Sequence, residues 1–436
     1  MPKKMLRRSR RAWLSLRRWQ RRLVFWLGAA AVGVAAILFA VGSEYVNGWL
    51  HQLLVVSPYL PLVVTPVGLA LVVWITRKYF PGSQGSGIPQ TIAALQITDA
   101  TAREHVLSLR IAAGKIALTL LALVSGASVG REGPTVQIGA SIMHALGRFG
   151  HFSRLETERA LILAGGAAGV AAAFNTPLAG IVFAIEEMSR SFEERTSGTV
   201  LTAVIVAGMA SLAVLGNYTY FGHTTATLDF NRGWLAVIAC GVAGGLAGGI
   251  FSQILVHSSR LLPQKISLLM RQRPVVFAAG CGLLLAIIGI ASGNTTYGTG
   301  YHEAKQILEG TASLPATYGL LKMLATMVSY LSGIPGGIFA PSLAVGAGLG
   351  DNLAGLVPYA PAGAVITLGM VAYFAGVVQA PITAFVIVME MTDNHTMAIP
   401  LMAAAMIAYA TSRLVCPVPL YKALAVRFLA PRQDKK

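Results

Sequence analysis

The sequence predicts an all-α polytopic membrane protein, because it is apolar, poor in charge and frequently interrupted by glycine and proline. Of its 436 residues, 55% are hydrophobic and only 12% are charged, whereas soluble domains carry about 25% charged residues. Apolar segments long enough to cross a bilayer recur along the chain. The 47 glycines exceed the usual share of about 7%, and glycine in a membrane segment permits close helix packing or a broken helix.

Residues 1–22 form a strongly basic segment that contains ten Lys and Arg residues and no acidic residue. The segment supplies ten of the 17 net positive charges of the chain. Because basic residues beside a membrane span stay on the cytoplasmic side, it predicts a cytoplasmic N-terminus near anionic lipid headgroups rather than binding to nucleic acid. The apolar run from Leu23 lacks a small-residue cleavage pattern, so we expect a retained span and no secretory signal.

The long apolar segments predict pairs of short or broken helices. Several segments exceed the ~20 residues of one crossing and contain Gly and Pro, and such breaks are tolerated only where they are buried or line a cavity. We expect apolar segments at 23–42, 52–76, 106–129, 160–187, 198–216, 234–257, 275–292, 315–347, 362–392 and 396–415, and a basic cytoplasmic loop at 258–273. The predicted regions are a basic cytoplasmic tail (1–22), a first transmembrane half (23–216), an external linker (217–233), a second transmembrane half (234–415) and a short cytoplasmic C-terminal segment without an appended soluble domain (416–436).

The two predicted halves contain an internal repeat. SGASVGREGP (125–134) aligns with SGIPGGIFAP (332–341) at an offset of 207, and NTPLAGIVFAIEEM (175–188) aligns with QAPITAFVIVMEMT (379–392) at an offset of 204. Interrupted apolar segments in corresponding positions of two halves point to a substrate site between them. The alternative is convergent use of Gly and Pro in unrelated helices.

Three glycine-rich motifs, GSGIPQ (85–90), GREGP (130–134) and GGIFAP (336–341), resemble the signature loops of the CLC family of chloride channels and proton-coupled chloride antiporters. FNTPLAGIVFAIEEM (174–188), APITAFVIVMEMTDN (380–394) and PLY (419–421) extend the resemblance to essentially the whole chain beyond the basic tail. It implies a CLC-type fold of two inverted repeats with broken, re-entrant helices. It also implies a homodimer with one pore per subunit, in the inner or plasma membrane.

The resemblance implies a chloride site with four ligands: the hydroxyls of Ser86 and Tyr421 and the amides of Ile338 and Phe339. The turn at 85–89 suits an anion, because a helix that begins there presents free N–H groups and a positive dipole end. The alternatives are a simple helix cap for Ser86 and core positions for Ile338 and Phe339. The supporting residues of this turn are Gly85, Gly87, Ile88 and Pro89.

Glu132 lies in GREGP, where a carboxylate in hydrocarbon is costly unless a favourable site repays it. The resemblance implies that Glu132 is the gating glutamate. Ionised, it occupies the outermost anion site, and protonated, it swings away and admits chloride. Arg131 and Lys115 are expected to support the loop and to raise the local positive potential. The alternative is a structural ion pair between Glu132 and Arg131 or Lys115.

Glu187 distinguishes an antiporter from a channel. The resemblance implies that this residue relays protons from the cytoplasm toward Glu132, while the alternative is a solvated helix end. Glu390 in the second half corresponds to Glu186, and we expect it to be structural. Gln90 stands where many antiporters of the family carry Glu, and Ser86 argues against the nitrate preference that accompanies proline at that position.

The sequence therefore predicts chloride transport, coupled to protons by antiport, with a passive chloride channel as the alternative. An intramembrane enzyme or a quinone-binding subunit would need an acid dyad, a Ser/His arrangement or a metal cluster. The eight histidines are scattered without an HExxH pattern, and the three cysteines lack metal-ligand spacing. We expect no enzymatic activity, no metal or other cofactor, no nucleic-acid partner, and only chloride, protons, lipid and a second copy of the chain as partners.

Overall fold

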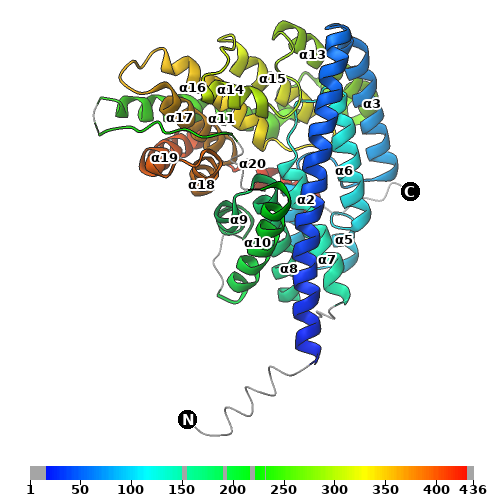
Figure 1. Ribbon diagram of the computed structural model, residues 1–436. Coiled ribbons are helices and arrows are strands. Elements are labelled where there is room, and N and C mark those ends of the chain that lie inside the picture. Colours follow the sequence, from blue (N-terminus) through cyan, green and yellow to red (C-terminus); the bar gives the residue numbers. More distant parts are fainter. Residues whose placement is uncertain (1–15, 150–154, 190–193, 217–220, 231, 430–436) are drawn as a thin grey trace, which may run out of the picture.

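The computed structural model describes residues 16–149, 155–189, 194–216, 221–230 and 232–429, and this part of the chain is helical without β-strands. Within these ranges, seven helices are long and apolar enough to cross a membrane. Large apolar side chains such as Leu38, Val63 and Ile287 remain exposed on the outer surface, as lipid contact requires. The predicted all-α polytopic fold is confirmed (Figure 1).

The first half of the chain begins with an unusually long helix, α2 (Leu16–Val56), which runs the length of the molecule in Figure 1. This helix has 41 residues, starts inside the basic segment and continues beyond the apolar run predicted at 23–42. The helices that follow it are α3 (Pro61–Tyr79), α4 (Ile88–Gln96), α5 (Ala100–Glu104), α6 (Leu109–Val124), α7 (Glu132–Phe149), α8 (Leu155–Phe174), α9 (Pro177–Phe183), the π-helical turn η1 (Ala184–Ser189) and α10 (Glu194–Leu215).

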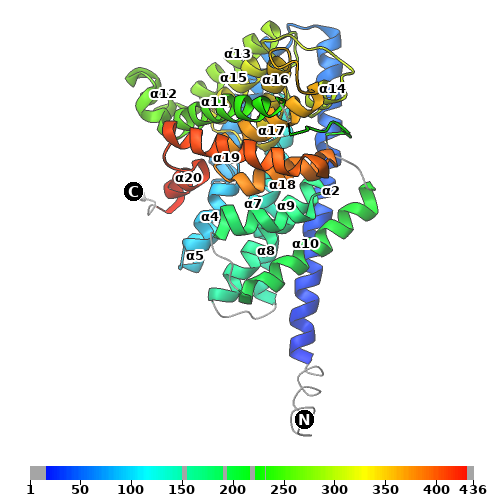
Figure 2. The same ribbon diagram turned by 90° about the vertical axis from the view of Figure 1, so that its left-hand side faces the viewer.

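The second half repeats this pattern of long and short helices. Its elements are α11 (Trp234–Leu261), α12 (Gln264–Gln272), α13 (Pro274–Ala291), α14 (Tyr301–Glu309), α15 (Tyr318–Leu331), α16 (Phe339–Ala354), α17 (Ala362–Val378), α18 (Pro381–Thr392), the 3₁₀ turn η2 (His395–Met397), α19 (Ala398–Val415) and α20 (Leu420–Leu429). In Figure 2, α11 and α19 lie side by side, and α20 lies near the left edge with the C-terminus.

The segment 258–273, predicted as a loop, is instead mostly helical. Helix α11 continues to Leu261, and α12 occupies Gln264–Gln272. Its apolar side chains Leu268 and Leu269 are exposed beside basic residues. A short helix with this composition can lie in the membrane surface, because its apolar side contacts lipid and its basic side contacts headgroups. The predicted loop is therefore wrong for the backbone conformation, because a basic composition does not exclude a helix.

The predicted breaks are present where both halves carry an X-x-Pro sequence. Asn175 and Gln379 each adopt a φ of +57°, which is the left-handed conformation that ends a helix. Two residues later, Pro177 and Pro381 begin α9 and α18, where the missing proline N–H costs nothing. The apolar segments at 160–187 and 362–392 are therefore each two helices, joined by a turn of the same shape.

Glycines let the helices of each half pack backbone to backbone. A Cβ atom at Gly139 on α7 would overlap the carbonyl oxygen of Gly165 on α8, and a Cβ at Gly346 on α16 would lie 2.7 Å from the carbonyl oxygen of Gly369 on α17. These two contacts correspond in the repeat. Close approach of this kind is what holds membrane helices together where the hydrophobic effect is absent.

Candidate ion-binding site

Three glycine-rich loops from distant parts of the sequence meet inside the protein. The N–H of Gly85 donates to the carbonyl of Ile334 (3.0 Å), and the N–H of Gly336 donates to the carbonyl of Gly85 (3.0 Å). Gly130 and Gly337 exchange two further backbone hydrogen bonds of 2.7 Å each. The GSGIP, GREGP and GGIFAP motifs are thereby fixed against one another.

Each of these loops ends at the start of a helix. Helix α4 begins at Ile88, α7 at Glu132 and α16 at Phe339. Neither Gly87 nor Ile338 caps the helix that follows with a side-chain hydrogen bond. The N-cap side chains therefore do not occupy the first N–H groups of α4 and α16, and the dipoles of these helices favour an anion.

Two buried hydroxyl groups, of Ser86 and Tyr421, lie together beside these helix starts. Ser86 is 1% exposed and Tyr421 is 0% exposed. The two hydroxyls are close enough to interact, yet neither has a hydrogen bond of ordinary geometry to any other group of the described chain. A buried hydroxyl without a partner carries an energetic penalty that a bound ion would remove.

Apolar and aromatic groups enclose this pair of hydroxyls. The ring of Phe339 lies 5.9 Å from the ring of Tyr421 and 4.8 Å from that of Phe374, measured between centroids. On the other side, a Cβ at Gly133 would overlap the Ser86 hydroxyl oxygen, so only glycine leaves room for that group. A low-dielectric wall of this kind strengthens every electrostatic interaction inside it.

The carboxylate of Glu132 is fully buried and turns back over Gly130. A Cβ at Gly130 would overlap one carboxylate oxygen of Glu132 and would lie 3.4 Å from the amide nitrogen of Ala340, in the first turn of α16. Glu132 is therefore at the junction of the first and second halves. Its neighbour Arg131 donates from Nη1 to the hydroxyl of Ser43 on α2 (3.0 Å).

Lys115 is fully buried and supports the GSGIP turn from behind. Its ammonium group donates to the carbonyl oxygens of Ser83 (2.7 Å) and Gly85 (2.6 Å). These bonds hold the turn one residue before Ser86. The supporting role of Lys115 at an anion site stays a prediction.

The second half contains a counterpart of this lysine and its turn that the sequence comparison missed. Lys322 lies 207 residues after Lys115 and donates to the carbonyls of Thr296, Tyr297 and Gly298 at 2.9–3.3 Å. The Gly298-Thr299-Gly300 turn has φ values of +65° and +77° at its glycines, compared with +65° and +101° at Gly85 and Gly87. In the sequence, the signal that could have identified this second turn is the Gly-x-Gly pair directly before a helix.

The two turns differ in what their hydroxyls do. The Thr299 hydroxyl accepts a hydrogen bond from the N–H of Tyr301 (3.3 Å), the first residue of α14, so the chain itself occupies this hydroxyl. Glu303 adds a carboxylate to the first turn of α14, which would repel an anion. In the second half, the Thr299 hydroxyl has a hydrogen-bond partner within the chain. In the first half, the Ser86 hydroxyl has no such partner in the described chain.

Glu186 and Glu187 are adjacent in the sequence but point to different surroundings. Both oxygens of Glu186 accept backbone N–H groups at the start of α18, from Ile382 (3.1 Å) and Thr383 (2.6 Å). Glu187 is 4% exposed, and its carboxylate is near enough to the Tyr421 hydroxyl for the two groups to interact electrostatically, as is that of Glu132.

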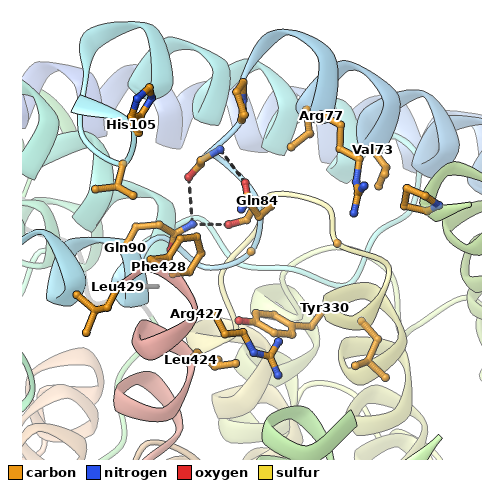
Figure 3. A pocket seen from close by; sticks show the side chains of 18 of the residues that line it. Val73, Arg77, Gln84, Gln90, His105, Tyr330, Leu424, Arg427, Phe428 and Leu429 are labelled. Atoms are coloured by element: carbon orange, nitrogen blue, oxygen red, sulfur yellow. Dashed lines mark hydrogen bonds between the residues drawn. The ribbon is translucent and has the colours of Figure 1, made fainter. Parts of the chain in front are cut away.

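A cavity of about 1120 Å³ reaches the GSGIP turn at Gly85 (Figure 3). The cavity is lined by three arginines from separate helices. They are Arg77 on α3, Arg271 on α12 and Arg427 on α20. Gln90 lies at its inner wall and donates from its amide to the carbonyls of Gly82 (3.1 Å) and Gln84 (2.5 Å). Sequence patterns missed the arginines, because only the fold brings them together.

The fold and this site define a membrane transport protein built from two inverted halves. Residues 68–413 match the family model described as voltage gated chloride channel. The chain belongs to that family, the CLC family, which consists of channels and transporters rather than enzymes. It is therefore an integral membrane protein of the chloride-transporting CLC type.

Three solved structures are similar to this chain over most of its length. A slow cyanobacterial Cl⁻/H⁺ antiporter has a TM-score of 0.79 and 25% sequence identity, over 94% of this chain and 99% of the other. A CLC-type fluoride/proton antiporter has a TM-score of 0.77 and 23% identity, over 92% and 97%. A eukaryotic CLC transporter has a TM-score of 0.74 and 20% identity, over 94% and 75%.

Proposed function

We propose that this protein is a proton/chloride antiporter in which Glu132 is the gate and Glu187 is the internal proton relay. The observation that carries the proposal is the burial of two acids, Glu132 (0% exposed) and Glu187 (4% exposed), inside an apolar protein. A passive chloride channel has no need of a second buried acid. A proton path that ends at a gating carboxylate does need one.

In this mechanism, chloride is held by the hydroxyls of Ser86 and Tyr421 and by the amides of Ile338 and Phe339. The unpartnered hydroxyls and the uncapped starts of α4 and α16 support this assignment. These groups are neutral dipoles, so they attract the ion without binding it as tightly as a full countercharge would. Arg77, Arg271 and Arg427 would raise the chloride concentration in the cavity that leads to the site.

Glu132 competes with chloride for the same group of amides. Ionised, its carboxylate occupies an anion position near the first turn of α16, and it blocks the outer end of the path. Protonated, it loses that attraction and swings away, which admits chloride. Each cycle of the gate therefore moves one proton on or off Glu132 as chloride passes.

Glu187 divides the proton path into shorter steps. A bare proton charge that crosses an apolar region costs at least several kcal/mol, and an intermediate carboxylate with bridging water lowers this barrier. Chloride avoids Glu187, because two negative charges repel each other. The two ion routes then diverge on the inner side and meet only near Glu132.

The experiment that tests the function is flux from vesicles reconstituted with the full chain, followed by chloride and pH electrodes together. An antiporter driven by a chloride gradient moves protons against their own gradient. If chloride moves and the pH stays constant, the protein is a passive chloride channel.

We further propose that the protein is a homodimer with both termini in the cytoplasm. The neighbouring helices α9, α10, α18 and α19 expose a continuous set of apolar side chains that includes Leu178, Ile205, Ile382 and Met406. A second copy would cover this face. Cross-linking in the membrane would detect the dimer.

A further inference from the structure

The helix that carries Glu186 and Glu187 changes its hydrogen-bonding pattern at these residues. Helix α9 is α-helical over Pro177–Phe183, and η1 continues it as a π-helical turn over Ala184–Ser189. A π turn is rare, widens the helix and is frequent at functional sites. This turn contains both acids, and the preceding residues Pro177–Phe183 are α-helical.

Glu186 is tied to the other half of the protein. Its carboxylate accepts the N–H groups of Ile382 and Thr383, which are among the first amides of α18. A carboxylate that caps a helix start satisfies amides that lack partners and also interacts with the helix dipole. Helices α9 and α18 are side by side in both views of the molecule (Figures 1 and 2), so this cap joins the two halves.

The second half makes the same cap in the opposite direction. Glu390 accepts the N–H groups of Leu178 (3.2 Å) and Ala179 (2.8 Å) at the start of α9. Yet α18 stays α-helical through Glu390 and ends at Thr392. The residue that follows Glu390 is the fully buried Met391. A reciprocal cap therefore does not require a π turn.

The difference between the two halves is the acid that follows the capping residue. In the first half, Glu187 must be buried toward Tyr421 while Glu186 reaches out to α18. Neighbouring residues of a regular α-helix point about 100° apart, because the helix has 3.6 residues per turn. The wider π turn changes this angle at Glu186 and Glu187, whose carboxylates have separate surroundings.

We propose that Glu186 is a positioning residue for proton transport: its cap on α18 holds the π turn, and the π turn holds Glu187 in line with Tyr421. This inference rests on the proposed function of Glu187 as the proton relay. Glu186 touches neither the transported chloride site nor Tyr421 in this scheme. It acts through the backbone of η1.

The test compares Glu186→Gln with its matched control Glu390→Gln in vesicles that contain the full chain. Gln keeps the size of the side chain but loses the charge and one of the two acceptor oxygens. We expect Glu186→Gln to retain its chloride flux and to lose proton flux by about fivefold, the factor expected from a weakened helix cap. Glu390→Gln should keep the wild-type ratio of proton to chloride flux, and Glu186→Asp should recover part of the lost proton flux.

Structures of the two variants give a readout that does not depend on transport. In Glu186→Gln, residues 184–189 should relax toward an α-helix and the Glu187 side chain should turn away from Tyr421. In Glu390→Gln, η1 should be unchanged. An intact π turn in Glu186→Gln overturns the positioning role, and so does an equal loss of proton flux in both variants.

The single variants separate this inference from the relay itself. If Glu187→Gln keeps full proton flux, the relay assignment is wrong and the positioning role falls with it. If Glu187→Gln abolishes proton flux but Glu186→Gln leaves it unchanged, only the positioning role is wrong.

Discussion

Gly130 and Gly337 exchange two backbone hydrogen bonds of 2.7 Å and thereby join the loop that carries Glu132 to the start of α16. Their sequence positions differ by 207, the same offset that separates the repeated motifs. The two halves thus contact each other through equivalent residues at the site itself. A Cβ at Gly337 would lie 3.0 Å from the nitrogen of Gly133, so glycine is required where the loops cross.

Replacement of Glu132 by Gln or Ala should abolish proton coupling and leave a chloride leak. The gate would then lack a group that binds and releases a proton, and the anion position that its carboxylate occupies would stay open. Vesicle flux with paired chloride and pH electrodes measures both quantities. Uphill proton pumping by either variant would contradict the gating assignment.

Ser86→Pro should raise nitrate transport relative to chloride transport. The variant removes the unpartnered hydroxyl that suits a small, strongly hydrated anion. Competition between the two anions in vesicles measures the ratio. Thr299→Ala is the matched control, because Thr299 occupies the equivalent turn but its hydroxyl accepts the N–H of Tyr301. The control should lose about 1 kcal/mol of stability, the typical contribution of one hydrogen bond, and keep its selectivity. Unchanged selectivity in a folded, active Ser86→Pro protein would falsify the chloride-site assignment.

Glu187→Gln should keep chloride movement and reduce proton movement to background. The amide preserves the shape of the side chain but carries no titrating proton, so the path to Glu132 loses its intermediate step. Glu186→Gln should have a much smaller effect. Proton flux driven by a chloride gradient, at equal protein content, distinguishes the two. Normal exchange by Glu187→Gln would mean that protons take another path.

Gly139→Ala should lower the stability of the protein by about 1–3 kcal/mol, the usual cost of an overpacked contact. The new Cβ would overlap the carbonyl oxygen of Gly165, which is backbone and cannot rotate aside. Gly280→Ala is the control, because nothing lies within 4 Å of a Cβ at that position on α13. Apparent melting temperatures in detergent should fall for the first variant only. Equal melting temperatures for the two variants would show that α7 and α8 can move apart without loss of stability.

The combined variant Arg77→Gln/Arg427→Gln should slow chloride flux at low ionic strength by about two- to tenfold. These arginines line the cavity that reaches Gly85, and a positive cavity concentrates anions. Added salt screens this effect, so the difference from the wild type should shrink as ionic strength rises. Arg413→Gln, a change outside the cavity lining, is the control. A deficit that persists in high salt would indicate a structural role instead.

Sequence patterns predicted the helical membrane fold and the broken segments, because hydropathy and Gly/Pro placement act locally. Asn175 and Pro177 illustrate this, since their neighbours alone define the break between α8 and α9. The three signature loops likewise identified Ser86 and Glu132 as site candidates, and the fold brings them together. The roles of these residues remain proposals that the flux experiments test.

Other features depend on contacts between distant segments, and no local pattern contains them. The family resemblance suggested Tyr421, but it is the packing of α20 against α4 that brings its hydroxyl to Ser86. The arginines of the cavity come from positions 77, 271 and 427. The π turn at Glu187 was also missed, because α9 and α18 have similar sequences and only one of them widens. Helix α12 was missed since basic residues were taken as a sign of a loop.

The turn at Gly298–Gly300 makes the two halves of the protein unequal. A buried lysine supports each turn, Lys115 in the first half and Lys322 in the second. In the second turn, the Thr299 hydroxyl accepts the N–H of Tyr301, whereas the Ser86 hydroxyl of the first turn has no such partner in the described chain. One repeated architecture therefore presents a hydroxyl to a ligand in one half only.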